Sequence, residues 1–466
     1  MSEDAIESAK LSLYAFHLSH DATSGEEQRT QDSDRLWETF AQLGKHLHIL
    51  SLANFRQFLA LPKRTVVFQE LLSDEIERCL RFSFPSQGTH PRHGELYGLQ
   101  IHDTYAADLT FHYRKPISVE DLTNLNPEGK LLANSIQASL GQTLVLFAKP
   151  QTDLNSEQLK ELSDRCLDAL VQPLDPSLKP SYLSQGKLLG SPIFEYDNFA
   201  KDPQQSCHVL IWLNTHPETK NLEESGEYYH PLINLLCSRS KIVLSYFQAG
   251  DRHQEARKVY QELEQQANIL KGLPENREER LKFLKKALVK TNPEAFTYAT
   301  HIRDIKDHHT AIATNLRNYT QSLQVLKKIP GEHDLKNFQD FEKQVNQYLN
   351  QIQTYLNYLV PGQDLFSHCI STMRGIVEIE QAEINNQLQK QETDLQNEIQ
   401  AIGVGIAAGA IVASTSGLMT EPWDFQNPKQ LEGQFPLPFL IALVGSFLCS
   451  FSAWKLARRW IKHQRN

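Results

Sequence analysis

The stretch AIGVGIAAGAIVASTSGLMTEPW spans Ala401–Trp423, and its first charged residue is Glu421. A transmembrane helix needs about 20 predominantly apolar residues, so this stretch is long enough to cross a bilayer. It is composed mainly of Gly, Ala, Ser and Thr rather than Leu and Phe, and Gly405 and Gly409 have the Gly-xxx-Gly spacing. Because small residues allow helices to pack closely in lipid, we predict a membrane span at 401–419 that packs against protein. Either it is the inner helix of a larger assembly, or the two glycines mediate simple dimerisation.

A second charge-free run, GQFPLPFLIALVGSFLCSFSAW, lies between Glu432 and Lys455. It is rich in Leu, Ile and Phe, which favour insertion, and it predicts a second span at 436–454, so that 401–455 forms a transmembrane hairpin. The tail at 456–466 is basic, whereas the loop between the spans is mainly acidic. Since positive charge marks the cytoplasmic side, both termini are expected in the cytoplasm, with the hairpin in a plasma or inner membrane.

The region before the first span, 251–400, predicts long helices. From Phe338 onward, apolar residues recur at alternating steps of three and four, which is typical of a coiled coil. Pro361 in VPGQD is expected to end this helix. A further helix is expected to run unbroken from about Ile376 into the first span as far as Ser416. Such a stalk needs partners, either other helices of the chain or other subunits.

Residues 1–250 alternate strand-like with helix-like runs, which indicates a cytosolic α/β or α+β domain. The strand-like runs are rich in β-branched and aromatic residues, and they lie at 11–18, 94–103, 108–115, 143–149, 208–214 and 241–247. The helix-like runs lie at 32–50 and 155–172, each with a polar start typical of a helix cap. The stretch 175–192 is expected to be a surface connection.

Composition narrows the classes of function. A net charge of -9 over 466 residues argues against nucleic-acid binding, which needs a basic surface to neutralise phosphates. The six cysteines have no paired spacing and predict neither a disulfide framework nor a zinc site. The start, MSEDAIESAK, has no secretory signal. We find no nucleophile elbow, kinase signature or phosphate loop, so we expect no catalytic residues, no cofactor and no enzymatic activity.

One short stretch, HIRDIKDHH, could bind a metal ion. On a helix, its residues His301, Asp304 and His308 would occupy positions i, i+3 and i+7 on one face. A solvated amphipathic helix face explains the same pattern. The stretch is therefore a weak metal candidate.

The order of segments resembles the CorA family of divalent-cation channels: an α/β domain, long helices, a small-residue span, a short outer loop, a second span and a basic tail. In that family five chains form a funnel, the long helix lines the pore and the second span surrounds it. The family signature Gly-Met-Asn would fall within STSGLMTEPW, where Gly417 matches the glycine but Leu418 and Met419 replace Met-Asn. Thr420 is the nearest polar residue, and Glu421 can supply the acidic loop.

Two functions therefore remain open. The resemblance implies a homo-oligomer, a pentamer if it is CorA-like, that transports a divalent cation such as Mg²⁺ through a pore; the pathway residues would be Thr415, Ser416, Gly417, Thr420 and Glu421. The alternative is a non-conducting coiled-coil protein, tethered to the lipid bilayer, whose cytosolic domain binds a partner. The small-residue first span favours the channel, and the missing Met-Asn pair favours the tether.

Overall fold

The computed structural model describes most of the chain before residue 386 and three residues beyond it. The described residues are 5–21, 28–62, 66–73, 76–84, 92–172, 174–385, Ile399, Gly403 and Ala407. The chain divides into two compact units: unit 1 contains Met1–Asp251 and Asp304–Tyr355, and unit 2 contains Arg252–Arg303 and Leu356–Asn466. The predicted α/β domain followed by long helices is confirmed.

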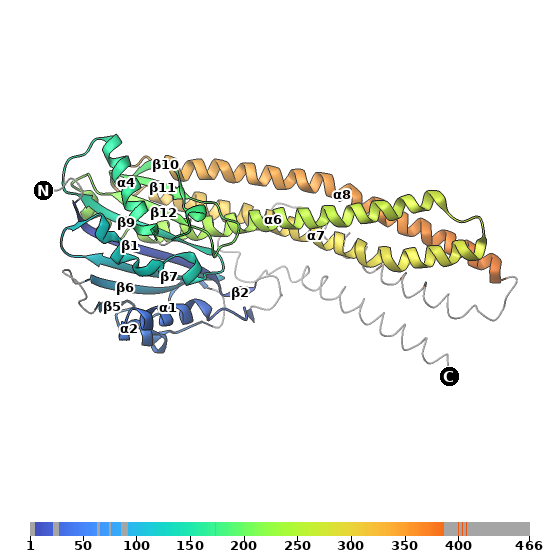
Figure 1. Ribbon diagram of the computed structural model, residues 1–466, viewed down its shortest axis with the longest axis horizontal. Helices are drawn as coiled ribbons and strands as arrows, with labels where there is room; N and C mark the ends of the chain where they lie inside the picture. Colours follow the sequence, from blue (N-terminus) through green and yellow to red (C-terminus); the bar gives the residue numbers. More distant parts are fainter. Residues whose placement is uncertain are drawn as a thin grey trace, which may run out of the picture. The chain divides into compact units, whose positions relative to one another are not determined.

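Unit 1 is built on one ten-stranded sheet in the order β10-β11-β12-β9-β1-β7-β6-β4, with β5 paired to β6 and β8 paired to β1 (Figure 1). The strands are β1 (Ala5–Leu18), β4 (Val66–Glu70), β5 (Leu80–Ser83), β6 (Arg92–His102), β7 (Thr104–Tyr113), β8 (Ile117–Ser118), β9 (Gly141–Pro150), β10 (Ser181–Leu188), β11 (Ser191–Asp197) and β12 (His208–Leu213). All these neighbours pair antiparallel except β9 and β12, which are parallel. A separate two-stranded ribbon joins β2 (His20–Asp21) and β3 (Gln28–Arg29).

The short helices of unit 1 are α1 (Arg35–His46), α2 (Leu50–Asn54), α3 (Ala133–Ile136), α4 (Ser156–Val171) and α5 (Thr219–Ser225), with 3-10 turns η1 (Phe55–Phe58), η3 (Glu120–Leu125), η4 (Pro127–Gly129) and η5 (Pro176–Leu178). The helices α1 to α4, with the turns η1 and η3, cover one face of this sheet, whereas Glu223 of α5 pairs with Lys10 on the opposite face. The apolar core packs α1, α4 and η3 against alternate residues of β1, β7, β9 and β12, such as Leu13, Leu109 and Leu146. The helix α4 begins with a capping box in which Asn155 and Gln158 bond each other's backbone N–H groups.

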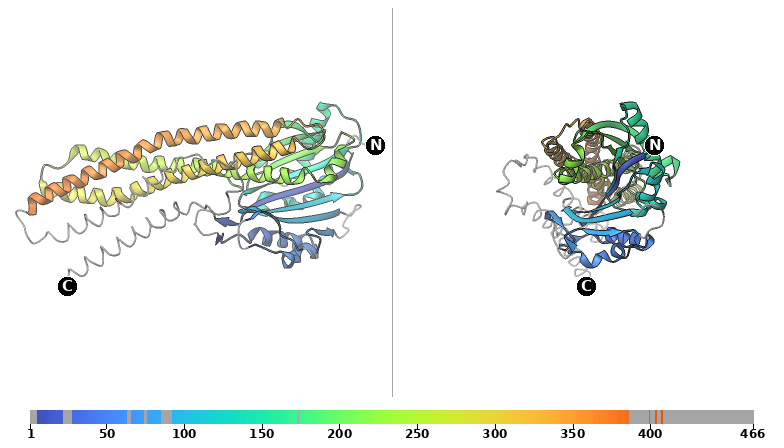
Figure 2. Two further views of the ribbon diagram at one scale, coloured as in Figure 1. Left: turned by 180° about the vertical axis from the view of Figure 1, so that it is seen from behind. Right: turned by 90° about the vertical axis from the view of Figure 1, so that its left-hand side faces the viewer.

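Three long helices follow: α6 (Tyr229–Ile269), α7 (Arg277–Leu326) and α8 (Lys336–Asn385), with the turn η6 (Leu270–Gly272) after α6. Each of the three contributes residues to both units. Within unit 2 their segments run side by side (Figures 1 and 2). They are held by an apolar cluster that contains Leu284 and Leu288 of α7 and Ile370, Met373 and Val377 of α8.

The expected elements of unit 1 are confirmed for most segments, and two are wrong. The run 241–247, expected as a strand, lies inside the 41-residue helix α6, where neighbouring turns and packing override its β-branched composition. The stretch 175–192, expected as a surface connection, contains β10 and the start of β11. Strand β10 lacks an apolar alternation because it is a half-exposed strand that pairs with β11 and forms a further bridge from Lys187 to Asp334.

The helix α8 runs through Pro361, so the prediction that VPGQD ends the helix is wrong. Proline removes one backbone hydrogen bond from a helix interior. Here the Tyr298 hydroxyl donates a hydrogen bond to the Leu359 carbonyl oxygen at 2.6 Å. The absence of a side chain at Gly362 lets the Tyr260 ring approach, since an added Cβ would lie 2.8 Å from that ring. Contacts with neighbouring helices therefore stabilise α8 across the proline.

The expected unbroken helix from Ile376 to Ser416 lies mostly outside the described residues. The helix α8 is described as far as Asn385, and beyond it Ile399 and Gly403 are helical. A Cβ added to Gly403 would lie 2.7 Å from a guanidinium nitrogen of Arg374. Ile399 packs against the apolar cluster of unit 2. These two residues therefore lie beside the helices of unit 2.

Candidate functional site

The residues predicted for the ion pathway lie outside the described part of the chain. They are Thr415, Ser416, Gly417, Thr420 and Glu421, and the packing glycines Gly405 and Gly409 lie there too. Among the described helices, none is both long and apolar enough to span a bilayer. The two predicted spans, 401–419 and 436–454, lie almost wholly outside the described residues.

The weak metal candidate lies on α7, as expected for its helical spacing. His301, Asp304 and His308 all belong to this helix. Within the described ranges, no three His, Cys, Asp or Glu side chains are grouped so that they could hold a metal ion. The geometry therefore adds nothing to the metal hypothesis, and we build no function on these residues.

The outward side of α8 in unit 2 carries a continuous uncharged stripe, which we call the α8 seam. Its members recur at alternating steps of three and four, and all are exposed except Gly375, which is partly buried: Tyr358, Pro361, Leu365, His368, Thr372, Gly375, Ile379 and Ala382. Three large apolar side chains are conspicuous, because Tyr358 is 78% exposed, Leu365 48% and Ile379 63%. Exposed apolar residues in a row mark an interaction surface, and this period is that of a coiled-coil contact.

Charged residues flank the α8 seam but do not enter it. Arg374 pairs with Glu378 at 2.9 Å, one helical turn apart. Asp364 is exposed between Pro361 and Leu365. An uncharged strip between charged flanks is the arrangement by which coiled coils bury one line of contact and leave the rest in water.

The inward side of α8 is fixed to α7. Arg280 donates from Nε to Glu380 Oε1 at 2.8 Å, and Arg277 pairs with Glu383 at 2.7 Å. The same helix buries Met373 and Val377 in the apolar cluster, so ion pairs and packing together fix the orientation of α8 about its own axis. The α8 seam therefore faces away from α7.

A buried ionic network lies on the other face of the sheet in unit 1, beneath the first part of α6. Arg239 pairs with Asp197 at 2.6 Å and lies 3.6 Å from Glu195. Glu195 contacts His208 Nε2 at 3.1 Å, and His208 Nδ1 bonds the Thr143 hydroxyl at 2.8 Å. Burial, reinforced by the Arg239 guanidinium, lowers the pKa of His208. The network is closed to solvent, so it joins α6 to three strands rather than serving a substrate.

The same face carries a second buried polar group. Asp108 of β7 accepts a hydrogen bond from the Thr110 hydroxyl at 3.0 Å, and Thr110 bonds Ser12 at 2.7 Å. Burial raises the pKa of Asp108 to about 6. Nearby, Lys10 pairs with Glu223 at 2.7 Å. This face is thus polar where the opposite face is apolar.

Sequence reasoning missed this polar face, although a signal was present. The strand segments SPIFEYD and HVLIWL place Glu195, Asp197 and His208 among apolar residues. Strand partners share a face, and Asp197 lies opposite His208 across β11 and β12. Ionisable residues at such positions indicate a polar layer under a covering helix.

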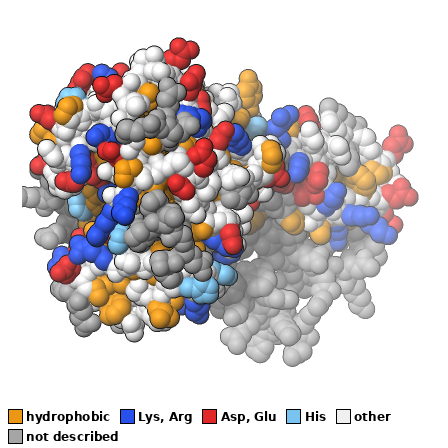
Figure 3. All heavy atoms as spheres, turned by 60° about the vertical axis from the view of Figure 1, so that its left-hand side comes forward, with side chains coloured by type: hydrophobic (Ala, Val, Ile, Leu, Met, Phe, Trp, Pro, Cys, Tyr) orange, Lys and Arg blue, Asp and Glu red, His pale blue; other side chains and the backbone are white. Residues whose placement is uncertain are grey.

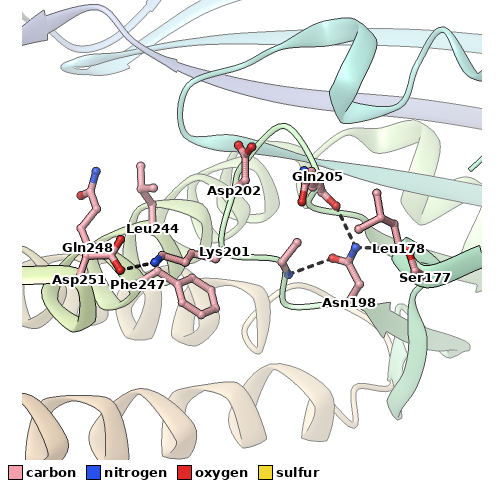
Figure 4. Close-up of a pocket in the computed structure, with 11 residues that line it drawn as sticks. Ser177, Leu178, Asn198, Lys201, Asp202, Gln205, Leu244, Phe247, Gln248 and Asp251 are labelled. Carbon is pink, nitrogen blue, oxygen red and sulfur yellow. Dashed lines mark hydrogen bonds and ion pairs between the residues drawn. The ribbon is translucent and has the colours of Figure 1, made fainter. Parts of the chain in front are cut away.

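A surface pocket of about 550 Å³ lies in unit 1 beside α6 (Figure 4). Lys201 and Asp251 form an ion pair across it. The Asn198 amide donates to the carbonyl oxygens of Leu178 at 2.8 Å and Gln205 at 2.9 Å. Lys201, Asp251 and the Asn198 amide are therefore each engaged with other groups of the protein.

Comparison of the chain with models of protein families, with curated proteins and with solved structures gives no match. Of the features described above, the α8 seam is the one that points to a partner.

Proposed function

We propose that the protein is a CorA-like homo-oligomeric channel or transporter for a divalent cation such as Mg²⁺, in which the first span lines the pore. The observation that carries this proposal is the α8 seam. A second copy of the same helix is a fitting partner, because an identical seam offers matching uncharged side chains at the same heptad period. Closed rings of copies would bring the predicted first spans together around one axis.

The charge pattern supports the membrane part of this proposal. The basic tail and the acidic loop support a topology in which both termini are in the cytoplasm and the loop is outside. Thr415, Ser416, Gly417 and Thr420 would then lie at the outer end of the pore, and Glu421 would concentrate cations there. Because Mg²⁺ gives up its water reluctantly, hydroxyl groups at this point suit a hydrated or partly hydrated ion.

A specific observation favours the second candidate, the non-conducting tether. Ile399 packs on the apolar cluster and Gly403 lies against Arg374. In a channel, the helix that contains Ile399 and Gly403 would continue into the bilayer to line the pore. A tether needs only a membrane anchor after these residues, whatever their packing. The replacement of the family's Met-Asn by Leu418 and Met419 points the same way.

Ion flux distinguishes the two functions. The full chain is reconstituted in liposomes that contain a divalent-cation dye, beside a variant in which Ala401–Ser416 is replaced by a Leu/Ala helix of equal length. The channel predicts flux through the native protein and its loss in the variant. In Glu421→Gln, flux should fall at low ionic strength and approach the native value at high salt, because screening removes the Coulomb attraction. Absence of native flux, or flux unchanged by the replacement, leaves the tether.

A further inference from the structure

The first part of α7 contains a run of thirteen residues whose charged side chains are all lysines. Between Arg280 and Glu294 the chain reads LKFLKKALVKTNP, in which the only charged residues are Lys282, Lys285, Lys286 and Lys290. On the face of unit 1 in Figure 3, by contrast, acidic and basic side chains are interspersed. The start of α7 is therefore a local concentration of positive charge in a chain of net charge -9.

This helix segment is amphipathic, but its outward side is not purely polar. Leu284, Leu288 and Thr291 are buried against the rest of unit 2. The lysines share the outward side with three apolar residues: Phe283 is 36% exposed, Val289 68% and Phe296 69%. We call Lys282, Phe283, Lys286, Val289, Lys290 and Phe296 the basic apolar face.

Two lysines of this face, Lys282 and Lys286, form no ion pair with any residue that the structure describes. Lys290 lies 3.9 Å from Glu294, whose carboxylate accepts a closer hydrogen bond from Gln266 at 2.8 Å. The arginines of the preceding turn behave differently, since Arg280 is paired with Glu380.

Lysines interleaved with exposed phenyl and isopropyl groups suit the surface of an anionic bilayer. The ammonium groups meet lipid phosphates while the apolar side chains enter the boundary between headgroups and acyl chains. A soluble acidic partner would match the charge but leave no reason for Phe296 to be so exposed. The bilayer also fits the position of the face. Ile399, two residues before the predicted first span, packs on the apolar cluster that contains Leu284 and Leu288.

We propose that the basic apolar face of α7 docks on the anionic lipid surface of the membrane that holds the predicted spans. The proposal rests on the membrane attachment in the proposed function and is independent of ion conduction. Each lysine near an anionic leaflet should strengthen docking about fivefold, so three lysines contribute on the order of a hundredfold.

The test uses the full chain with Cys449→Ala and Phe296→Cys, which carries an environment-sensitive fluorophore. The described native cysteines are all buried, so labelling is directed to the new thiol. The protein is inserted in nanodiscs of phosphatidylcholine alone or with phosphatidylglycerol. We expect brighter, blue-shifted emission only with the anionic lipid, and a loss of the effect at high salt. The same label at Thr310→Cys, exposed on α7 in unit 1, should not respond.

The triple variant Lys282→Gln, Lys286→Gln, Lys290→Gln should abolish the response. Glutamine has a similar helix propensity, and circular dichroism verifies that the variant remains folded. A matched control, Lys306→Gln, Lys327→Gln, Lys328→Gln, removes the same charge from exposed positions on α7 in unit 1 and in the turn directly after it, and should retain the response.

Three results would overturn the proposal: no response in inserted protein, an equal response to both lipids, or an equal response in detergent to poly-glutamate or single-stranded DNA. Insertion is scored separately, by retention of the chain in discs after alkaline wash. If the chain does not insert, the proposed function fails, and flotation of the soluble protein with anionic against phosphatidylcholine vesicles still decides whether the face binds lipid.

Discussion

Arg239 of α6 pairs with Asp197 of β11 at 2.6 Å, and both side chains are at most 5% exposed. A buried guanidinium between two carboxylates links the long helix to the sheet. Breaking such a pair on one side is costly, because the remaining charge stays in a medium that solvates it poorly.

Replacing Arg239 with Met should therefore lower the free energy of unfolding of unit 1 by about 3 to 5 kcal/mol. Thermal unfolding followed by the fluorescence of buried Trp37 and Trp212 measures the loss. The control Lys220→Met removes an exposed pair with Glu224, 3.7 Å apart, and should cost less than about 1 kcal/mol. Equal effects of the two changes would mean that the buried network does not hold α6.

Asp108→Asn should change the pH dependence of stability. Burial raises the pKa of Asp108 from 3.8 to about 6. The folded state therefore binds a proton that the unfolded state releases between about pH 4 and pH 6, and stability should fall as pH rises through this window. The carboxylate should cost roughly 3 kcal/mol above pH 6. The Asp108→Asn variant retains an oxygen that can accept the hydrogen bond from Thr110. Its free energy of unfolding should rise relative to that of the native protein between pH 4 and pH 7. A difference between the two proteins that does not change with pH would contradict this prediction.

The α8 seam should control assembly. Leu365→Asp with Ile379→Asp places charges in the uncharged line and should dissociate the oligomer in detergent, because burying unpaired carboxylates is unfavourable. Static light scattering gives the mass, and circular dichroism should show unchanged helicity. Ser367→Asp with Ser371→Asp adds the same charge to exposed positions of α8 beside the seam and should leave the mass intact. A seam variant with native mass would show that α8 does not mediate self-association.

Gly362→Ala should destabilise unit 2 by about 1 to 3 kcal/mol, since overpacking forces neighbouring atoms to move. The added Cβ would lie 2.8 Å from both the Tyr260 ring and the Tyr298 hydroxyl oxygen. Gly250→Ala in α6 is the matched control, because nothing lies within 4 Å of its new Cβ. It should stabilise the helix by about 0.5 to 1 kcal/mol. A lower melting temperature for Gly250→Ala than for Gly362→Ala would contradict this packing argument.

The sequence alone determined the class of the chain's main segments. The β-branched and aromatic residues in 11–18 and 143–149 predicted β1 and β9, and the polar start at Asn155 predicted α4. These patterns are local: a strand or helix face must be apolar at its own period to be buried. The charge-free runs after Glu398 are equally local signals, and the predictions made from them lie outside the described residues.

The tertiary structure decided what depends on distant residues. The segment 241–247 is helical because α6 continues through it and Arg239 is fixed to Asp197. Pro361 is accommodated because Tyr298 and Tyr260 pack beside it. The sequence period of α8 predicted an apolar side that packs, and its members, such as Val345 and Val377, are buried. The exposed α8 seam is a different side of the helix, and only the packing of α7 against Met373 and Val377 showed that it faces outward. Burial is a property of the assembled helices, so no single helix's sequence specifies it.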